Sequence, residues 1–378
     1  MRPFISQLAL LGLSSLAVYA LFFSVSLIFM PPQRQAVGMD TARASSTLFA
    51  TEPKYVFLNR SMLNTKHNKV LLLGASNMAV GFKQDKVQQM IRAAEVNNLS
   101  VGGSNVTQLR QIVDLVHEVQ SGEARRHNTF VIGMWYGLFV DDSQRWTTAD
   151  RQAGDTDIDI ERYRYGFFRR TEAGPVAVLP PQWLDLGVHI IHPYLVIDKL
   201  VRDATKTIRQ MISIVPPATT DAQRNIKTVS EQDKHRYLAF WRKYMGEGKL
   251  SDSQFQTFAL LVDEILATGG RVIVMNLPIP HWHEQGSPYQ SEYRKRAHEL
   301  LAALSRRSGV SVFQLQDVGE DDEFSDEVHP KPRVAEQWAQ QLAVALNDHF
   351  GKDGGVNENV ASGELPKSAL HQLTTVSK

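Results

Sequence analysis

The sequence contains no cysteine among its 378 residues. Disulfide bonds, thiolate catalysis and zinc sites with cysteine ligands are therefore excluded. Neither sign of charge is in excess, because 41 Lys and Arg residues meet 40 Asp and Glu residues. We find no basic patch interleaved with aromatic side chains, so no nucleic-acid partner is predicted. The hydrophobic share of 43% is that of an ordinary globular protein.

Charge is also absent from one long stretch near the N-terminus, between Phe4 and Met30. A helix needs about 20 residues to cross a bilayer, and this stretch is longer. A cleaved signal peptide is the alternative, but its apolar region would span about 7–15 residues and end in small residues. The stretch instead ends in "SLIFMPPQ". We therefore predict an uncleaved signal anchor over residues 1–30, with the remainder of the chain outside the cytoplasm.

From residue 69 onwards, short apolar runs alternate with amphipathic segments, which is the pattern of βαβ units and a parallel sheet. Residues 31–68 are predicted to be a linker and entry segment, and residues 351–378 a disordered tail. The α/β domain between them, 69–350, is interrupted by an insertion at 141–250. The expected strands are 70–73, 96–101, 129–135, 271–278 and 309–316, and the expected helices are 84–94, 106–120, 252–268, 291–307 and 333–350.

Ser76 follows the first of these strands in "LLLGASN". The carboxyl ends of parallel strands are where open α/β sheets bind ligands, so Ser76 is a candidate nucleophile. The alternative is that Ser76 only caps the next helix, because serine is a favoured N-cap residue.

A general base for such a serine is present near the end of the domain, in "FSDEVHPKP". A serine hydroxyl needs a base, and the base needs an orienting partner. The spacing of Asp326 and His329 allows the carboxylate to reach the imidazole Nδ1. A surface acid–histidine turn is the alternative interpretation. Because these residues follow the last strand, their turn can open onto the same sheet edge as Ser76, which favours catalysis.

Three further segments are candidate parts of a site. Gly103, in "NLSVGGSN", lies on either an oxyanion-binding turn or a plain strand-to-helix turn. Trp135 and Tyr136 end the third strand and either contact a carbohydrate substrate or belong to the core. His281 follows the fourth strand and is predicted to line the site. His281 and His283 alternate as metal ligands sometimes do, but no third ligand is evident, so no metal is predicted.

These segments resemble the conserved blocks of the SGNH (GDSL-like) hydrolase superfamily. The first block reads Gly74-Ala75-Ser76, the second includes Gly103, and the last is the Asp-x-x-His pattern of Asp326 and His329 before the final helix. The resemblance covers about residues 69–348. It implies a three-layer, flavodoxin-like fold with an inserted cap and no cofactor.

The same resemblance assigns roles to residues. Ser76 would be the nucleophile, His329 the base and Asp326 its orienting partner, with the backbone N–H groups of Ser76 and Gly103 in the oxyanion hole. The third block departs from the family, which has Gly-x-Asn with the asparagine as an oxyanion donor. This chain has tryptophan, Trp135, at the place of that asparagine.

Within the superfamily, the anchor, the altered third block and the large insertion look most like membrane-anchored polymer-modifying proteins. Examples are the D-alanine transfer protein of teichoic acid D-alanylation and the alginate-type O-acetylation proteins. The resemblance implies an O-acyltransferase, most simply an O-acetyltransferase, that modifies a polysaccharide through an acyl-serine. The acyl donor would be passed from a multi-spanning membrane-bound O-acyltransferase in the cytoplasmic membrane. A carbohydrate acetyl esterase and a non-catalytic scaffold protein are the alternatives.

Overall fold

A single parallel sheet organises the protein. The computed structural model describes residues 2–29, 60–141, 168–172, 174–180, 190–212, 219–245, 249–315 and 319–353, with residues 56, 163, 183, 186 and 187 between them. Five parallel strands form the sheet in the order β2-β1-β3-β6-β7. They are β1 (Lys69–Leu73), β2 (Glu95–Asn98), β3 (Asn128–Met134), β6 (Arg271–Asn276) and β7 (Val310–Gln314). The predicted mixed α/β fold with a parallel sheet is confirmed.

Alternation within the strands places a hydrophobic core on each face of the sheet. In β1, Leu71 and Leu73 pack into one core, whereas Val70 and Leu72 pack into the other. All five residues of β1 are buried, as expected for a strand covered by helices on both sides. The strand order is one of the common orders of doubly wound sheets, whose ligand site lies where the order reverses, here between β1 and β3.

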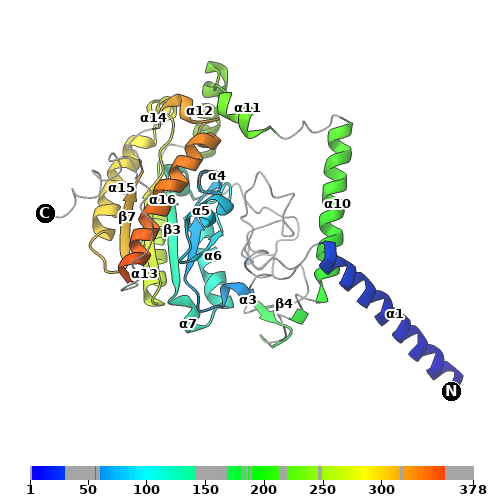
Figure 1. Cartoon of the computed structure of the whole chain (residues 1–378). Coiled ribbons are helices and arrows are strands. Elements are labelled where there is room, and N and C mark those ends of the chain that lie inside the picture. Colours follow the sequence, from blue (N-terminus) through cyan, green and yellow to red (C-terminus); the bar gives the residue numbers. More distant parts are fainter. Residues whose placement is uncertain are drawn as a thin grey trace, which may run out of the picture.

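Helices cover both faces of the sheet (Figure 1). The first face carries α6 (Val106–Val119), α13 (Asp252–Ala267) and α15 (Gln290–Leu304). The second carries α4 (Ser76–Gly81), α5 (Gln84–Met90) and α16 (Pro332–Asp353). Short elements fill the connections, namely α3 (Arg60–Leu63), α7 (Gly122–Arg125), α14 (His281–Gly286) and the 3-10 turns η2 (Tyr136–Leu138) and η3 (Asp321–Glu323).

The N-terminal helix α1 (Arg2–Phe29) stands apart from the α/β domain (Figure 1). Its segment Pro3–Ile28 has a mean hydropathy of 2.1, and nearly all of it is exposed, Ser26 being its one buried residue. This one helix is therefore long and apolar enough to cross a membrane, which agrees with the predicted anchor. Most of the predicted linker and tail lie outside the described residues.

The segment predicted as an insertion contains a small antiparallel hairpin and three helices in its described part. The hairpin is β4 (Phe168–Thr171) with β5 (Gly174–Ala177). The helices are α10 (His192–Met211), α11 (Asp221–Ile226) and α12 (Glu231–Met245). Of these, α12 packs against α14 of the α/β domain, and α11 packs against α16.

Candidate active site

Ser76 lies on a tight turn between β1 and α4. A Cβ at Gly74 would lie 2.5 Å from the Cβ of Met78 and 3.2 Å from the Gly133 carbonyl oxygen, so only glycine fits this turn. The N-cap position of α4 is occupied by Ala75, which has no side-chain cap, and Ser76 is the first helical residue. Among the described residues the Ser76 hydroxyl makes no hydrogen bond. The structure therefore gives Ser76 no helix-capping role.

The turn after β2 lies directly beside Ser76. The chain continues past the strand in register with β1, because the Val101 N–H donates to the Gly74 carbonyl at 2.8 Å. A Cβ on Gly102 would lie 3.6 Å from the Cβ of Ser76. Gly103 follows with a φ of +69°, a left-handed conformation that favours glycine. The structure thus brings the predicted nucleophile and the predicted oxyanion turn together.

Asp326 and His329 form a hydrogen-bonded pair on the turn before α16. The Nδ1 atom of His329 lies 2.9 Å from Oδ1 and 2.8 Å from Oδ2 of Asp326. Oδ1 also accepts hydrogen bonds from the backbone N–H groups of Val328 at 3.1 Å and His329 at 2.9 Å. The carboxylate therefore fixes both the backbone of the turn and the orientation of the ring. The predicted contact between Asp326 and Nδ1 is present, and it leaves Nε2 for another partner.

The turn that carries His329 is held against the helix that begins at Ser76. β7 is the edge strand and α16 packs on α4 and α5, so the chain crosses back over the sheet between them (Figure 1). A Cβ on Gly81, the last residue of α4, would lie 3.5 Å from Cγ of Pro330. The turn of His329 therefore packs against α4, the helix that begins at Ser76, and the described residues show no hydrogen bond between Ser76 and His329.

The charges of this turn favour a protonated imidazole. Burial raises the pKa of Asp326, but hydrogen bonds from the His329 ring and from two backbone N–H groups outweigh burial, so this pKa lies below its ordinary value. Burial lowers the pKa of His329, but the hydrogen bond and charge of Asp326, with the charge of Glu327, outweigh it and raise that pKa. Burial and the charge of Asp326 raise the pKa of Glu327 to about 7. An imidazolium formed by proton transfer to His329 is therefore stabilised.

A second histidine, His283, forms a hydrogen bond with the backbone of this turn. It is fully buried, and its Nδ1 lies 2.6 Å from the backbone carbonyl oxygen of Glu327. A carbonyl only accepts, so Nδ1 carries the proton and Nε2 accepts from the Tyr136 hydroxyl at 2.5 Å. Burial lowers the pKa of His283 to about 4, which keeps the ring neutral as this arrangement requires. The end of β3 and helix α14 thus position the turn between Asp326 and His329.

The predicted substrate contacts differ in their exposure. Trp135 is 4% exposed and Tyr136 is fully buried. Their rings pack against Trp241 of α12, with centroids 5.0 and 5.9 Å away. Neither side chain offers surface to a substrate in this structure, because both belong to the core that joins β3 to the insertion. The core alternative applies to them, and Tyr136 acts instead as the hydrogen-bond donor to His283.

His281, in contrast, is exposed on the first turn of α14 and contacts Gln285. Its substrate role stays a prediction. The described residues contain no group of three or more His, Cys, Asp or Glu side chains arranged to hold a metal ion. His281 and His283 do not form a pair of ligands, because His283 is committed to Tyr136 and Glu327.

Sequence reasoning missed the supporting role of His283. The only signal was its place two residues after His281, in a segment between two strands, and that spacing does not reveal the partners. Comparisons of the chain with protein-family models and with curated proteins find no match. The described residues include a serine hydroxyl, a histidine and a carboxylate that orients its ring, which are the groups that acyl transfer through a serine requires.

Proposed function

We propose that this protein is an SGNH-type serine O-acyltransferase, held at the membrane by α1, that transfers an acetyl group to an extracytoplasmic polysaccharide. The α/β domain would then be the three-layer, flavodoxin-like SGNH domain, and the insertion its cap. In this proposal the domain faces the periplasm or the cell exterior, across the cytoplasmic membrane from the N-terminus.

The observation that carries the proposal is the hydrogen-bonded Asp326–His329 pair, on a turn whose Pro330 packs against α4, the helix that begins at Ser76. Two carboxylate oxygens within 2.9 Å of Nδ1 leave only Nε2 of the imidazole to act as a base. Among the described residues, the hydroxyl of Ser76 has no hydrogen-bond partner that it would have to leave before it reacts. Catalytic hydrogen bonds are often long in the free enzyme and tighten when substrate binds, so the missing Ser76–His329 bond is compatible with this role.

The reaction would proceed in two halves. His329 Nε2 takes the proton of the Ser76 hydroxyl while Oγ attacks the carbonyl carbon of the acyl donor. Collapse of the tetrahedral intermediate breaks the bond to the donor, and His329 returns the proton to the leaving group. A sugar hydroxyl then attacks the acyl-serine, His329 takes its proton, and the proton returns to Ser76 Oγ as the new ester leaves. Asp326 stays ionised throughout and stabilises the imidazolium.

Trp135 occupies the position at which the family pattern has a side-chain donor to the oxyanion hole. In the family pattern an asparagine side chain at this position would donate to the oxyanion, but the indole of Trp135 is turned into the core. The backbone N–H groups of Ser76 and Gly103 are then the proposed donors. Because loss of one donor costs about 10²–10³ in rate, we expect slower acylation than in members that keep the asparagine.

Acyl-serine trapping tests the proposal. The full-length protein in detergent is treated with an activated acetyl ester, and peptides are analysed by mass spectrometry. We expect an acetyl group on Ser76, its loss in Ser76→Ala, and no change in a Ser291→Ala control, because Ser291 is an exposed serine of α15. Absence of acetyl-Ser76 together with unchanged polymer acylation in cells that express Ser76→Ala would leave only the scaffold alternative.

The acceptor decides between the two enzymatic alternatives. If the acyl-enzyme transfers acetyl to an oligosaccharide faster than to water, the protein is a transferase. If water is the faster acceptor and oligosaccharides have no effect, it is an acetyl esterase. Co-purification with a multi-spanning O-acyltransferase would identify the proposed source of the acyl group.

A further inference from the structure

Helix α10 carries an apolar stripe that no described part of the protein covers. Ile197, Leu200, Val201, Ile208 and Met211 follow one another at helical spacing, so they lie on one face. Their exposed fractions are 48, 54, 57, 57 and 78%. The helix faces the protein with another side, where Val196 is 5% exposed. Soluble proteins rarely expose an apolar stripe of this length without a partner.

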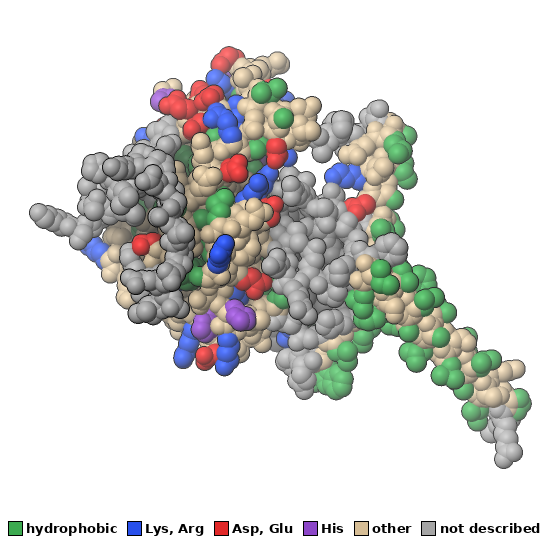
Figure 2. Space-filling model, in the orientation of Figure 1, with side chains coloured by type: hydrophobic (Ala, Val, Ile, Leu, Met, Phe, Trp, Pro, Cys, Tyr) green, Lys and Arg blue, Asp and Glu red, His purple; other side chains and the backbone are tan. Residues whose placement is uncertain are grey.

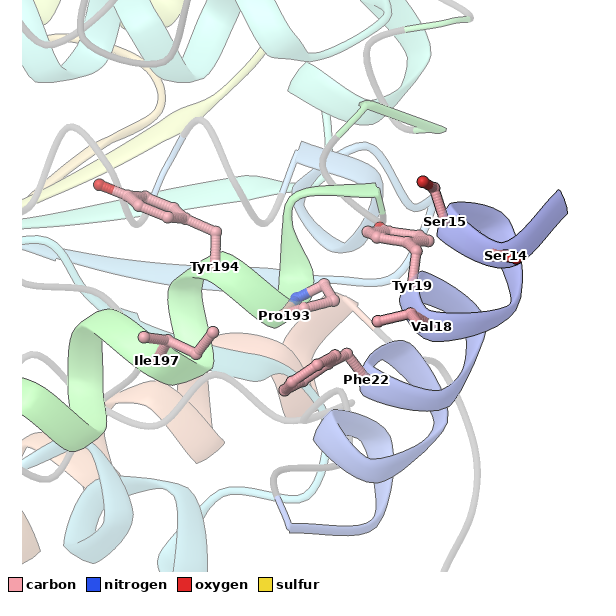
Figure 3. A pocket seen from close by; sticks show the side chains of 8 residues that line it. All are labelled: Ser14, Ser15, Val18, Tyr19, Phe22, Pro193, Tyr194 and Ile197. Carbon is pink, nitrogen blue, oxygen red and sulfur yellow. The ribbon is translucent and has the colours of Figure 1, made fainter. Parts of the chain in front are cut away.

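The stripe continues onto the N-terminal helix. Figure 2 shows hydrophobic side chains along α1 and along the outer edge of α10, with the charged side chains of α10 on its inner side. An apolar groove separates the two helices where they meet (Figure 3), and it is lined by Ser14, Ser15, Val18, Tyr19, Phe22, Pro193, Tyr194 and Ile197. Helix α1 is apolar on every side and therefore suited to lipid. Because α10 packs against α1, the lipid around α1 would also contact α10.

A hydrogen bond fixes the start of α10 to α1. The hydroxyl of Tyr19 donates to the backbone carbonyl of Ile190 just before α10. In an apolar environment an unpaired carbonyl costs several kcal/mol, so this bond removes an obstacle to placing the start of α10 at a membrane.

The charge of α10 suits the surface of a bilayer. Its sequence, residues 192–211, contains four Lys or Arg residues and two Asp residues. Arg209 is exposed and Lys206 is half-buried, and both lie off the apolar stripe. Apolar residues on one side and basic residues on the other are typical of helices that lie in the membrane interface and bind anionic lipids.

We propose that α10 lies in the interface of the bilayer that α1 spans, with its apolar stripe at the acyl-chain boundary. The occupant of the stripe is lipid. The protein therefore contacts its membrane through two elements that are distant in sequence.

Depth-dependent fluorescence quenching tests this proposal. The chain has no cysteine, so single cysteines can be introduced into the full-length protein and labelled with an environment-sensitive dye. Val201→Cys and Ile208→Cys probe the stripe. Arg209→Cys, on another side of α10, and Leu260→Cys, an apolar residue of α13 that is 49% exposed, are the matched controls. The proteins are reconstituted into vesicles of phosphatidylcholine and phosphatidylglycerol.

We expect shallow nitroxide-labelled lipids to quench the dye at positions 201 and 208 roughly twofold or more over the controls, with the opposite order for aqueous iodide. Equal access of iodide to 201, 208 and 260 would overturn the proposal. Protection of 201 and 208 from both quenchers would also overturn it, because a protein and not lipid would then cover the stripe. In Leu200→Asp, the label at 208 should lose its lipid quenching while the melting temperature stays unchanged.

Discussion

Replacing His283 by phenylalanine tests whether its hydrogen bonds support the turn of Asp326 and His329. The substitution keeps a buried aromatic ring but removes both hydrogen bonds, so the Tyr136 hydroxyl and the Glu327 carbonyl each lose their His283 partner. Each buried group that loses its partner costs about 1–3 kcal/mol, so the free energy of unfolding should fall by about 2–6 kcal/mol. At roughly 2–4 °C per kcal/mol for a domain of this size, the melting temperature falls by about 4–24 °C.

Catalysis should fall as well, because the Glu327 carbonyl belongs to the peptide chain between Asp326 and His329. A displacement of about 1 Å can cost about 10²-fold in rate, so we expect acyl-serine formation to slow by about 10- to 100-fold. The assays are thermal unfolding followed by circular dichroism and acetylation of Ser76 by mass spectrometry. His281→Phe, an exposed neighbour on the same helix, is the control for unfolding and should melt with the wild type.

A double-mutant cycle separates the hydrogen bond from general repacking. Tyr136→Phe alone leaves the His283 Nε2 acceptor unpaired, whereas Tyr136→Phe with His283→Phe removes both partners. The double variant should therefore lose less stability than the sum of the single variants, by about 0.5–3 kcal/mol. Strictly additive losses, or a His283→Phe protein that melts at the wild-type temperature, would refute the proposed support.

Three other predictions concern the same region. Because burial lowers the pKa of His283 to about 4, its neutral form contributes stability above pH 6.5 that is lost as pH falls towards 4; His283→Phe should flatten this acid limb of the unfolding curve. Asp326→Asn should slow acylation by at least about 10²-fold and move the midpoint of the pH–rate profile down, because the carboxylate no longer raises the pKa of His329; an unmoved midpoint would assign the base elsewhere. Gly74→Ala should lower the melting temperature, since its Cβ would lie 2.5 Å from the Cβ of Met78, and a variant as stable as the wild type would contradict the tight turn.

The sequence predicted the strands well because parallel strands are short apolar runs, although the boundaries of several elements differ from those expected. The helix expected over 84–94 ends at Met90. The side chain of Gln88 explains this, because its amide donates to the carbonyls of Ile91 and Ala94 while its oxygen accepts from the Val96 N–H. The strand expected over 96–101 ends at Asn98, although Leu99 and Val101 still donate to the β1 segment.

The pairing of Asp326 with His329 was predictable because it is local, three residues apart. The support of that pair by His283 could not be predicted from the sequence. His283 is 44 residues from Glu327 and 147 residues from Tyr136, and helical or strand periodicity carries no information over such separations. The same limit applies to Trp135 and Tyr136. A position at the end of a strand is compatible with both a site and the core. Packing against α12 of the insertion, which buries Trp135 and Tyr136, could not be predicted from the sequence.

The insertion connects α10 with the residues that support the turn of His329. It leaves and re-enters the domain at one place, because the Ser251 N–H donates to the Phe139 carbonyl at 2.9 Å and Ser253 donates to Asp141 at 3.0 Å. From this base it extends to α10, the proposed membrane contact, and to α12, whose Trp241 packs on Tyr136.

Helix α12 also reaches α14, where a Cβ on Gly286 would lie 2.4 Å from Cδ1 of Leu238. His283 belongs to α14 and accepts a hydrogen bond from Tyr136. Its Nδ1 in turn donates to the Glu327 carbonyl in the turn of His329. A strand-to-strand connection that only closed the sheet would need neither contact. The contacts place one segment between the proposed membrane contact and the proposed base, His329, which is the arrangement that the proposed transfer of an acyl group from the membrane requires.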